Sequence, residues 1–250
     1  MEKEKLFLNR IRELADLAYS RDIVTFTGVL NLNELNMVNS LRLENSGVKL
    51  DFYGGYEFAE RQMVAFLPDA LSYEWTYPIQ CIKITNCAPK YSQPLGHRDY
   101  LGALIHLGID RSTLGDILIK GSQAYVFCQE HLSDFILENL CRVKNNQVLP
   151  EVIDNPADLP GREYESIVQT VASLRLDSIL AVAFHASRSS LVQHIENGNV
   201  FVNGKMVTSN GYALKEGDIV SFRGKGKFEF AGTSGQSRKG RQIIQIHRYI

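Results

Sequence analysis

The chain has 250 residues, of which 44% are hydrophobic and 22% are charged, and its formal net charge at neutral pH is −1. These values are typical of an ordinary soluble protein that is long enough for two or three modest domains. No apolar run approaches the roughly 18 residues that a membrane-spanning helix needs, and the charged start lacks the apolar core of a signal peptide. The expected compartment is therefore the cytoplasm.

The charges are unevenly distributed along the chain. Residues 175–250 contain eleven Lys or Arg and five Asp or Glu, a balance of +6, whereas residues 1–174 contain 16 and 23, a balance of −7. A basic part on an otherwise acidic chain indicates a polyanion as the partner of the basic part. The acidic part is expected to keep the chain soluble, and contact with other proteins is a further role for it.

Residues 1–75 predict an N-terminal α/β domain. Periodic apolar residues predict helices, and short β-rich runs between turn residues predict strands. Asn31 is expected to cap the second helix, because Glu34 follows at the position that completes a capping box. The predicted elements are a helix over 2–20, a strand over 23–27, a helix from 31 to about 41, a strand over 48–52 and a helix over 57–67 that stops at Pro68.

Residues 76–153 predict a middle domain with the order β-α-β-β-α-β, the ferredoxin-like order that RNA-recognition-motif folds share. In such motifs, bases stack on aromatic side chains of the central strands. Tyr125 and Phe127 would share one face, but their strand lacks the glycine and the basic residue of that motif, so we expect both in the core. The predicted elements are strands over 79–84, 116–119, 124–128 and 147–153 and helices over 99–107 and 131–140.

Residues 154–163 are dense in turn formers and predict a linker to a C-terminal domain over 164–250. Ser187 is a strong N-cap candidate for the second of two helices, and Asn203-Gly204 is the favoured pair for a type I′ hairpin turn. The predicted elements are helices over 174–184 and 187–198, strands at 200–202, 205–207 and 219–222 with a turn at 217–218, and a flexible loop over 233–237.

Cationic residues of this C-terminal domain are candidates for contacts with the phosphates and sugars of an irregular RNA. Arg188 is the first choice, because the helix dipole disfavours a guanidinium in a first turn and an anion partner would offset this. An ion pair with Asp177 or Glu196 is the alternative for Arg188, and a packing role is the alternative for His194. Gly224–Lys227 is either a loop that approaches phosphate closely or a solvated turn. The predicted RNA-binding residues are Arg175, Arg188, Ser189, Gln193, His194, Asn203, Lys205, Arg223, Lys225 and Lys227.

No pattern of catalytic or metal-binding residues stands out. Cys81, Cys87, Cys128 and Cys141 form no C-x-x-C pair and have no histidine at zinc-ligand spacing, so free thiols are expected, with a reactive cysteine as the alternative. The sequence His97–Asp99 matches part of a kinase catalytic loop, but the asparagine, the D-F-G segment and the glycine-rich loop of kinases are missing. We expect no enzyme activity, no cofactor and no metal.

Four short segments of the C-terminal domain follow one another in order. They are R-L-D at 175–177, S-R-S at 187–189, V-F-V-N-G-K at 200–205 and G-D-I-V-S at 217–221. Together they resemble the RNA-binding domain first seen in small-subunit ribosomal protein S-four. The predicted fold class is therefore α+β: an N-terminal α/β unit, an RNA-recognition-motif-like middle domain and a C-terminal RNA-binding domain of the S-four type.

Further segments extend this resemblance over nearly the whole chain, most weakly in the first 75 residues. They are G-H-R-D-Y-L-G-A-L at 96–104, L-G-I at 107–109, G-D-I at 115–117 and S-F-R-G-K-G-K-F at 221–228, and with them the chain resembles the YlmH family. The resemblance implies binding to rRNA and tRNA on the large ribosomal subunit, in quality control of stalled nascent chains, and a link to cell division.

The resulting expectation is a monomeric, non-enzymatic RNA-binding factor with no membrane contact. Its expected partners are rRNA, tRNA, the large subunit and nascent-chain quality-control factors. A protein-interaction factor at the division site and an accessory protein of RNA modification are the alternatives.

Overall fold

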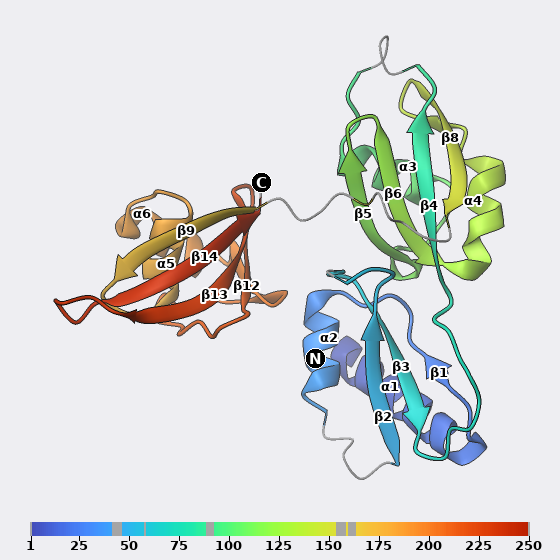
Figure 1. Ribbon diagram of the computed structural model, residues 1–250, viewed down its shortest axis with the longest axis horizontal. Coiled ribbons are helices and arrows are strands. Elements are labelled where there is room, and N and C mark those ends of the chain that lie inside the picture. The colour runs from blue at the N-terminus through green and yellow to red at the C-terminus, as the bar shows by residue number, and fades with distance from the viewer. Residues whose placement is uncertain are drawn as a thin grey trace. The chain divides into compact units, whose positions relative to one another are not determined.

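The computed structural model describes residues 2–41, 47–57, 59–88, 93–153, 159 and 164–249. It is a mixed α+β structure with three antiparallel sheets (Figure 1). The chain divides into two compact units, Met1–Pro160 and Gly161–Ile250. The predicted linker over 154–163 lies outside the described residues apart from Leu159. No helix in the described part of the chain is both long enough and apolar enough to cross a membrane.

The N-terminal part of the first unit is a three-stranded sheet with the order β1-β3-β2 and two helices. The predicted capping box is confirmed: Asn31 Oδ1 accepts hydrogen bonds from the N–H groups of Asn33 and Glu34, and Glu34 Oε2 accepts from the Asn31 N–H at 2.8 Å. The elements are α1 (Glu2–Arg21), β1 (Thr25–Phe26), α2 (Leu32–Asn39), β2 (Val48–Tyr53) and β3 (Met63–Pro68).

The helix predicted around 57–67 is wrong. Met63–Pro68 forms β3, the central strand of the sheet, which pairs with β1 and β2. Met63, Val64, Ala65 and Phe66 are all buried, because β3 has strands on both sides and α1 packs against it. An apolar run without a polar face gives the same pattern in a buried strand and in a buried helix, so periodicity alone does not separate them.

The middle part of the first unit is a five-stranded sheet with the order β5-β6-β4-β8-β7. Tyr100 and Leu104 of α3 and Ile136 of α4 pack in one core with Ile82 and Val126 of the sheet, so both helices cover the same face. Each helix and strand predicted over 79–153 is present. The elements are β4 (Ile79–Asn86), α3 (His97–His106), β5 (Leu114–Lys120), β6 (Gln123–Gln129), α4 (Ser133–Asn139), β7 (Arg142–Val143) and β8 (Asn146–Ile153).

On the face of this sheet opposite α3 and α4, other residues of the first unit cover Phe127. Tyr125 and Phe127 are only 2% and 1% exposed. The ring of Tyr56 stacks on that of Phe127 with 5.0 Å between the centroids, and Leu159 packs on the same cluster. A Cβ atom at Gly55 would lie 2.2 Å from Phe127 Cδ1, so the Gly55 backbone itself touches the ring. The prediction that both aromatic residues belong to the core is confirmed.

A buried polar joint connects the N-terminal part to the middle sheet. Asp116 of β5 accepts hydrogen bonds from Tyr56 Oη at 2.9 Å, from the Glu60 N–H at 2.7 Å and from the Arg61 N–H at 3.2 Å. Burial raises the pKa of Asp116 and lowers the pKa of Arg61. The Arg61 guanidinium donates to the carbonyl oxygens of Val29, Arg111 and Leu114.

The second unit is a six-stranded sheet with the order β11-β10-β12-β13-β14-β9. Leu176 and Ile179 of α5 and Leu191 of α6 share one core with Phe228 and Ile244 of the sheet, so both helices lie on one face (Figure 1). The elements are β9 (Tyr164–Val171), α5 (Leu176–Ala183), α6 (Arg188–Glu196), β10 (Val200–Val202), β11 (Lys205–Met206), β12 (Ile219–Phe222), β13 (Gly226–Gln236) and β14 (Gln242–Tyr249).

Local signals in the second unit are confirmed. Ser187 Oγ accepts from the Ser190 N–H and caps α6. Asn203 and Gly204 have φ angles of 49° and 75°, the two positive values that a type I′ turn requires.

The sheet is larger than predicted, and the flexible loop predicted over 233–237 is wrong. Strand β13 continues to Gln236 and pairs with β14, with register shifts between Phe230 and Gly232 and between Thr233 and Gly235. Such bulges accommodate glycine and polar residues inside a paired strand, and composition alone makes the same residues resemble a loop.

Candidate nucleic-acid interface

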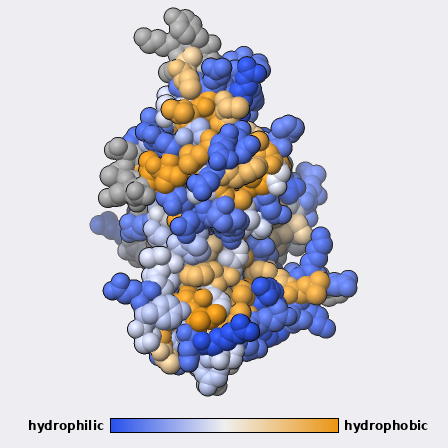
Figure 2. Space-filling view, turned by 90° about the vertical axis from the view of Figure 1, so that its right-hand side faces the viewer, coloured by the Kyte–Doolittle hydropathy of each residue, from blue (hydrophilic) through white to orange (hydrophobic). Residues whose placement is uncertain are grey.

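Hydrophobic side chains do not mark a site on the face of the molecule in Figure 2. Orange areas there are interrupted by blue hydrophilic side chains. The exposed apolar residues of α4 and β8 include Phe135, Leu149 and Val152, and single exposed apolar residues are ordinary on protein surfaces.

All ten predicted RNA-binding residues lie in the second unit, and all except Asn203 and Lys227 are exposed. The ten side chains do not all contact one another. Arg175, Arg188 and Ser189 lie at the N-terminal ends of α5 and α6. Gln193 and His194 belong to α6, Asn203 to the β10–β11 turn and Lys205 to β11. Arg223 and Lys225 lie in the β12–β13 turn, and Lys227 is in β13.

Arg175 and Arg188 share one carboxylate. Arg175 Nε lies 3.1 Å from Asp177 Oδ1 and its Nη2 lies 3.4 Å from Oδ2, whereas Arg188 Nη2 lies 3.9 Å from Oδ1. The two guanidinium side chains are 46% and 50% exposed, and that of Asp177 is 10% exposed. The alternative pairing of Arg188 with Asp177 is thus present, but the contact is long. Two cations on one anion leave a net positive charge and free donors for a phosphate.

The start of α6 adds further donors to this place. Ser187 Oγ satisfies the N–H of Ser190, one of the four donors that a helix start leaves without an internal partner. The exposed Ser189 hydroxyl lies 3.2 Å from Ser187 Oγ. The positive end of the helix dipole and Arg188 together favour an anion here.

Phe201 and Arg223 form a cation–aromatic pair on the opposite side of the sheet from the helices. Val200 and Val202 are buried under α5 and α6, so Phe201 between them points to the other face. The Arg223 guanidinium lies over the Phe201 ring, 5.4 Å from its centroid. A planar base can stack on such a pair. Phe201 was not predicted as a site residue, although the alternation of its strand indicates an outward side chain.

His194, Lys225 and Lys227 lie near the end of β12 at Phe222. The His194 ring contacts the edge of Phe222 with 5.2 Å between centroids, so the packing alternative for this histidine is present although the residue is exposed. Lys225 lies in the turn between β12 and β13, and Lys227 is the second residue of β13. Gly224 and Gly226 beside them have φ angles of 78° and 122°. The turn geometry by itself accounts for these glycines.

Asn203 uses its whole side chain inside the unit. Its Nδ2 donates to Asp218 Oδ1 at 2.8 Å, and its Oδ1 accepts from the Ile219 N–H at 2.9 Å. These bonds join the β10–β11 turn to the start of β12. Lys205, beside Asn203, is exposed.

Two of the four cysteines are buried thiols of low reactivity. All four are free, as predicted, with Cys81 and Cys128 buried and Cys87 and Cys141 exposed. Burial raises the pKa of both Cys81 and Cys128 to about 12, so these thiols stay protonated at neutral pH. Among the described residues, no group of three or more His, Cys, Asp or Glu side chains could hold a metal ion.

Two family models match the chain. Residues 74–155 match the model of the YlmH RNA-binding domain, and residues 174–220 match the S4 domain. Both families are RNA-binding families, and neither is a catalytic one.

The chain is a homologue of a curated protein over nearly its full length. It is 28% identical to the ribosome-associated protein quality control protein P2 of Bacillus subtilis (strain 168) over 247 residues, which are 98% of this chain and 95% of that protein. It is also 38% identical over 80 residues to the small ribosomal subunit protein uS4 of Thermobifida fusca (strain YX), which are 32% of this chain and 39% of that protein.

A solved structure shares the fold. The cell division protein ylmH from Streptococcus pneumoniae superposes with a TM-score of 0.54 at 17% identity, covering 64% of this chain and 96% of the other.

Proposed function

Since the chain belongs to the YlmH family, with a YlmH RNA-binding domain and a C-terminal S4 domain, we propose that it is a non-enzymatic factor that binds rRNA and tRNA on the large ribosomal subunit. The homology over nearly the full length to a ribosome-associated quality control protein supports a role on stalled nascent-chain complexes. Such a factor acts in the cytoplasm as a monomer and has quality-control factors as neighbours.

The contact that supports this function most directly is the shared carboxylate of Asp177. Because Asp177 is largely buried, it holds Arg175 and Arg188 close together without neutralising both. A pair of exposed guanidinium groups at the start of a helix suits the phosphates of a folded RNA. The remaining exposed residues, Gln193, His194, Lys205, Arg223 and Lys225, would extend the contact along the RNA backbone.

We further infer that the middle part of the first unit is RNA-recognition-motif-like and that the chain has three domains, over 1–75, 76–153 and 164–250. The order β4-α3-β5-β6-α4-β8 and the antiparallel neighbours β5-β6-β4-β8 support the ferredoxin-like assignment. The buried positions of Tyr125 and Phe127 argue against base stacking on this sheet face.

Sedimentation with large ribosomal subunits tests the function. The Arg188→Glu variant should bind about tenfold more weakly than the wild type at moderate salt, because it replaces a phosphate contact with a repulsive charge. Arg238→Glu is the matched control, since Arg238 is also an exposed arginine of the second unit but lies outside the predicted surface. Circular dichroism establishes that both variants are folded.

Wild-type sedimentation of a folded Arg188→Glu variant would contradict the RNA-surface assignment. Crosslinking in cells separates the function from a protein-interaction role. Adducts mainly to rRNA and tRNA are expected, and adducts mainly to proteins would favour the division-site alternative.

A further inference from the structure

The middle domain matches an RNA-binding family, but the sheet face that RNA-recognition motifs use is closed where its aromatic residues lie. Phe127 is covered by Tyr56 and touched by the backbone of Gly55. If this domain binds RNA as part of the proposed function, the contact must lie elsewhere. The end of the sheet at Asn86 is the alternative, because Asn86 lies at the other end of β4 from Cys81, the residue that pairs with Phe127.

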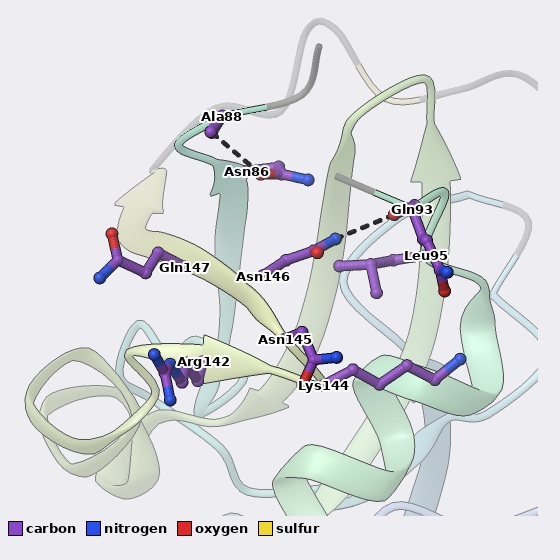
Figure 3. A pocket seen from close by; sticks show the side chains of 9 residues that line it. All are labelled: Asn86, Ala88, Gln93, Leu95, Arg142, Lys144, Asn145, Asn146 and Gln147. Atoms are coloured by element: carbon purple, nitrogen blue, oxygen red, sulfur yellow. Dashed lines mark hydrogen bonds between the residues drawn. The ribbon is translucent and has the colours of Figure 1, made fainter. Parts of the chain in front are cut away.

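A pocket of about 460 Å³ lies at this end, between β8, the β7–β8 turn and residues 93–95 (Figure 3). Among the described residues, its lining contains two cations, Arg142 and Lys144, and no acidic residue. The rest of the lining is dominated by carboxamides, which offer both hydrogen-bond donors and acceptors. These are Asn86, Gln93, Asn145, Asn146 and Gln147.

Two of the carboxamides are fixed by the fold. Asn146 Nδ2 donates to the Gln93 carbonyl oxygen at 2.9 Å, and Asn86 Oδ1 accepts from the Ala88 N–H at 3.1 Å. Figure 3 shows both side chains directed into the hollow. The side chains of Gln93, Asn145 and Gln147 are exposed and have no hydrogen-bond partner within the part of the chain that the structure describes. The pocket therefore has rigid walls and adjustable polar groups at its rim.

The pocket continues on both sides. On one side it shares Asn86, Gln93 and Leu95 with a hollow of about 160 Å³ at the β5–β6 turn. On the other side it shares Arg142 and Lys144 with a hollow of about 520 Å³ between α3 and α4. We call this series of three hollows the end track. Its shape is extended, which suits a chain-like ligand better than a small molecule.

The end track is cationic although residues 1–174 carry a net charge of −7. Arg98, Arg142 and Lys144 line it. Asp99 is the one acidic residue in the described lining, and it pairs with Lys144 at 2.7 Å. The side chains of Arg98 and Arg142 have no ion pair within the described residues, so both can bind phosphate.

We propose that the end track binds a single-stranded segment of RNA, with the edge of one base in the carboxamide pocket and the neighbouring phosphates on Arg142 and Arg98. Asparagine and glutamine side chains can satisfy the donors and acceptors of a Watson–Crick edge, which is accessible only in an unpaired base. The inference rests on the proposed function and adds a second RNA contact, remote in sequence from the S4 domain.

Photocrosslinking tests the proposal with the full-length protein and short single-stranded RNA oligonucleotides that contain 4-thiouridine. Crosslinks are mapped by mass spectrometry. We expect adducts on peptides that contain Gln93 and residues 142–147, in addition to adducts in the second unit. A hairpin RNA with the same labelled uridines in its stem should lose the former adducts.

Two variants separate the phosphate contact from the base contact. Arg142→Glu should reduce the end-track adducts about tenfold with every oligonucleotide. The triple variant Gln93→Ala, Asn145→Ala, Gln147→Ala should reduce them about threefold or more, with an effect that depends on the labelled base. Arg12→Glu, an exposed arginine of α1, is the matched control and should change nothing.

The outcomes distinguish this inference from the proposed function. Adducts in the second unit without adducts on the end track, or end-track adducts that neither variant lowers, would overturn the inference and leave the function intact. Loss of adducts in both units, together with unchanged sedimentation of Arg188→Glu, would overturn both.

Discussion

The middle sheet and the C-terminal sheet both carry helices on one face, and they differ in what happens to the opposite face. In the middle sheet, Tyr125 and Phe127 on that face are buried, and the N-terminal part supplies the stacked ring of Tyr56. In the C-terminal sheet, Phe201 remains partly exposed beneath the Arg223 guanidinium. Tyr164 likewise lies near solvent and stacks on His247.

This difference teaches that an aromatic residue on a strand does not by itself indicate a base-stacking surface. Tyr125 and Phe127 lie two residues apart on β6 and so share one face of the sheet. Phe201 lies between two buried valines on β10 and so points to the face opposite theirs. What differs is that a segment with Gly55 and Tyr56 covers the aromatic residues of the middle sheet. Asp116 and Arg61 hold this segment in place. Variants that remove the cover or the exposed ring test the comparison directly.

The largest effect is expected when the joint beneath the covered face is broken. Arg61→Ala removes hydrogen bonds to three carbonyl groups and leaves Arg111 as the remaining cation near Asp116. The free energy of unfolding of the first unit should fall by about 3 kcal/mol, because buried groups lose charged partners. Urea unfolding measures this, with Arg10→Ala as the control, since Arg10 only pairs with exposed Glu13. Equal stability of the two variants would show that the joint does not hold the cover.

A somewhat smaller effect is expected at Gly55, where the cover touches the sheet. Gly55→Ala adds a Cβ atom that would lie 2.2 Å from the Phe127 ring, at a φ of +98°. We expect a loss of about 2 to 3 kcal/mol from strain and overpacking. Gly121→Ala is the matched control, because Gly121 also has a positive φ but open space around it, and it should lose only about 1 kcal/mol. An equal decrease of the melting temperature in both variants would show that the contact with Phe127 does not affect stability.

On the open face of the C-terminal sheet, the effect should appear in binding. Phe201→Ala removes the ring under Arg223, and the affinity for single-stranded RNA should fall about tenfold, the scale of one lost stacking contact. Fluorescence anisotropy with labelled RNA measures this. Val168 of β9 lies on the same face of the sheet as Phe201 and is 61% exposed, so the control variant Val168→Ala should bind as the wild type does. An unchanged affinity of the Phe201 variant would mean that the open face is not a stacking surface.

The smallest expected effect is a change in the pH dependence of stability. Burial raises the pKa of Asp116 above 3.8, so its contribution to stability is present below 3.8 and is lost as the pH rises through the raised value. In Asp110, hydrogen bonds from Ser112 lower the pKa, so its contribution is present above 3.8 and is lost as the pH falls.

Asp116→Asn and Asp110→Asn should therefore change the slope of stability against pH in opposite directions. Chemical unfolding at a series of pH values from acid to neutral measures both slopes. Slopes that change in the same direction would contradict the assignment of a buried carboxyl to the joint.

Features that depend on a few adjacent residues could be predicted from the sequence. The capping box at Asn31, the cap at Ser187 and the turn at Asn203-Gly204 are each determined within four residues, and all three are present. The strand identity of Met63–Pro68 was missed, because it depends on the pairing with β1 and β2. Strand β9 was missed for the same kind of reason, since its partner is β14.

The candidate sites divide in the same way. Arg188 and its neighbour Asp177 were recognised because two consecutive helices bring them together. The end track was not, because Gln93 and Asn146 are separated by 53 residues and meet only through the fold of the middle sheet. Single polar residues at those positions have no distinctive pattern in the sequence.

The pairing of β9 with β14 also sets the order of events during synthesis. Tyr164–Val171 leaves the ribosome before every other strand of the second unit, yet it pairs only with Gln242–Tyr249, the last strand to emerge. Closing so long a loop is slow, and until then neither edge of β9 is paired. The second unit therefore completes its sheet only after translation of β14, so a shortened or interrupted nascent chain lacks a finished C-terminal sheet.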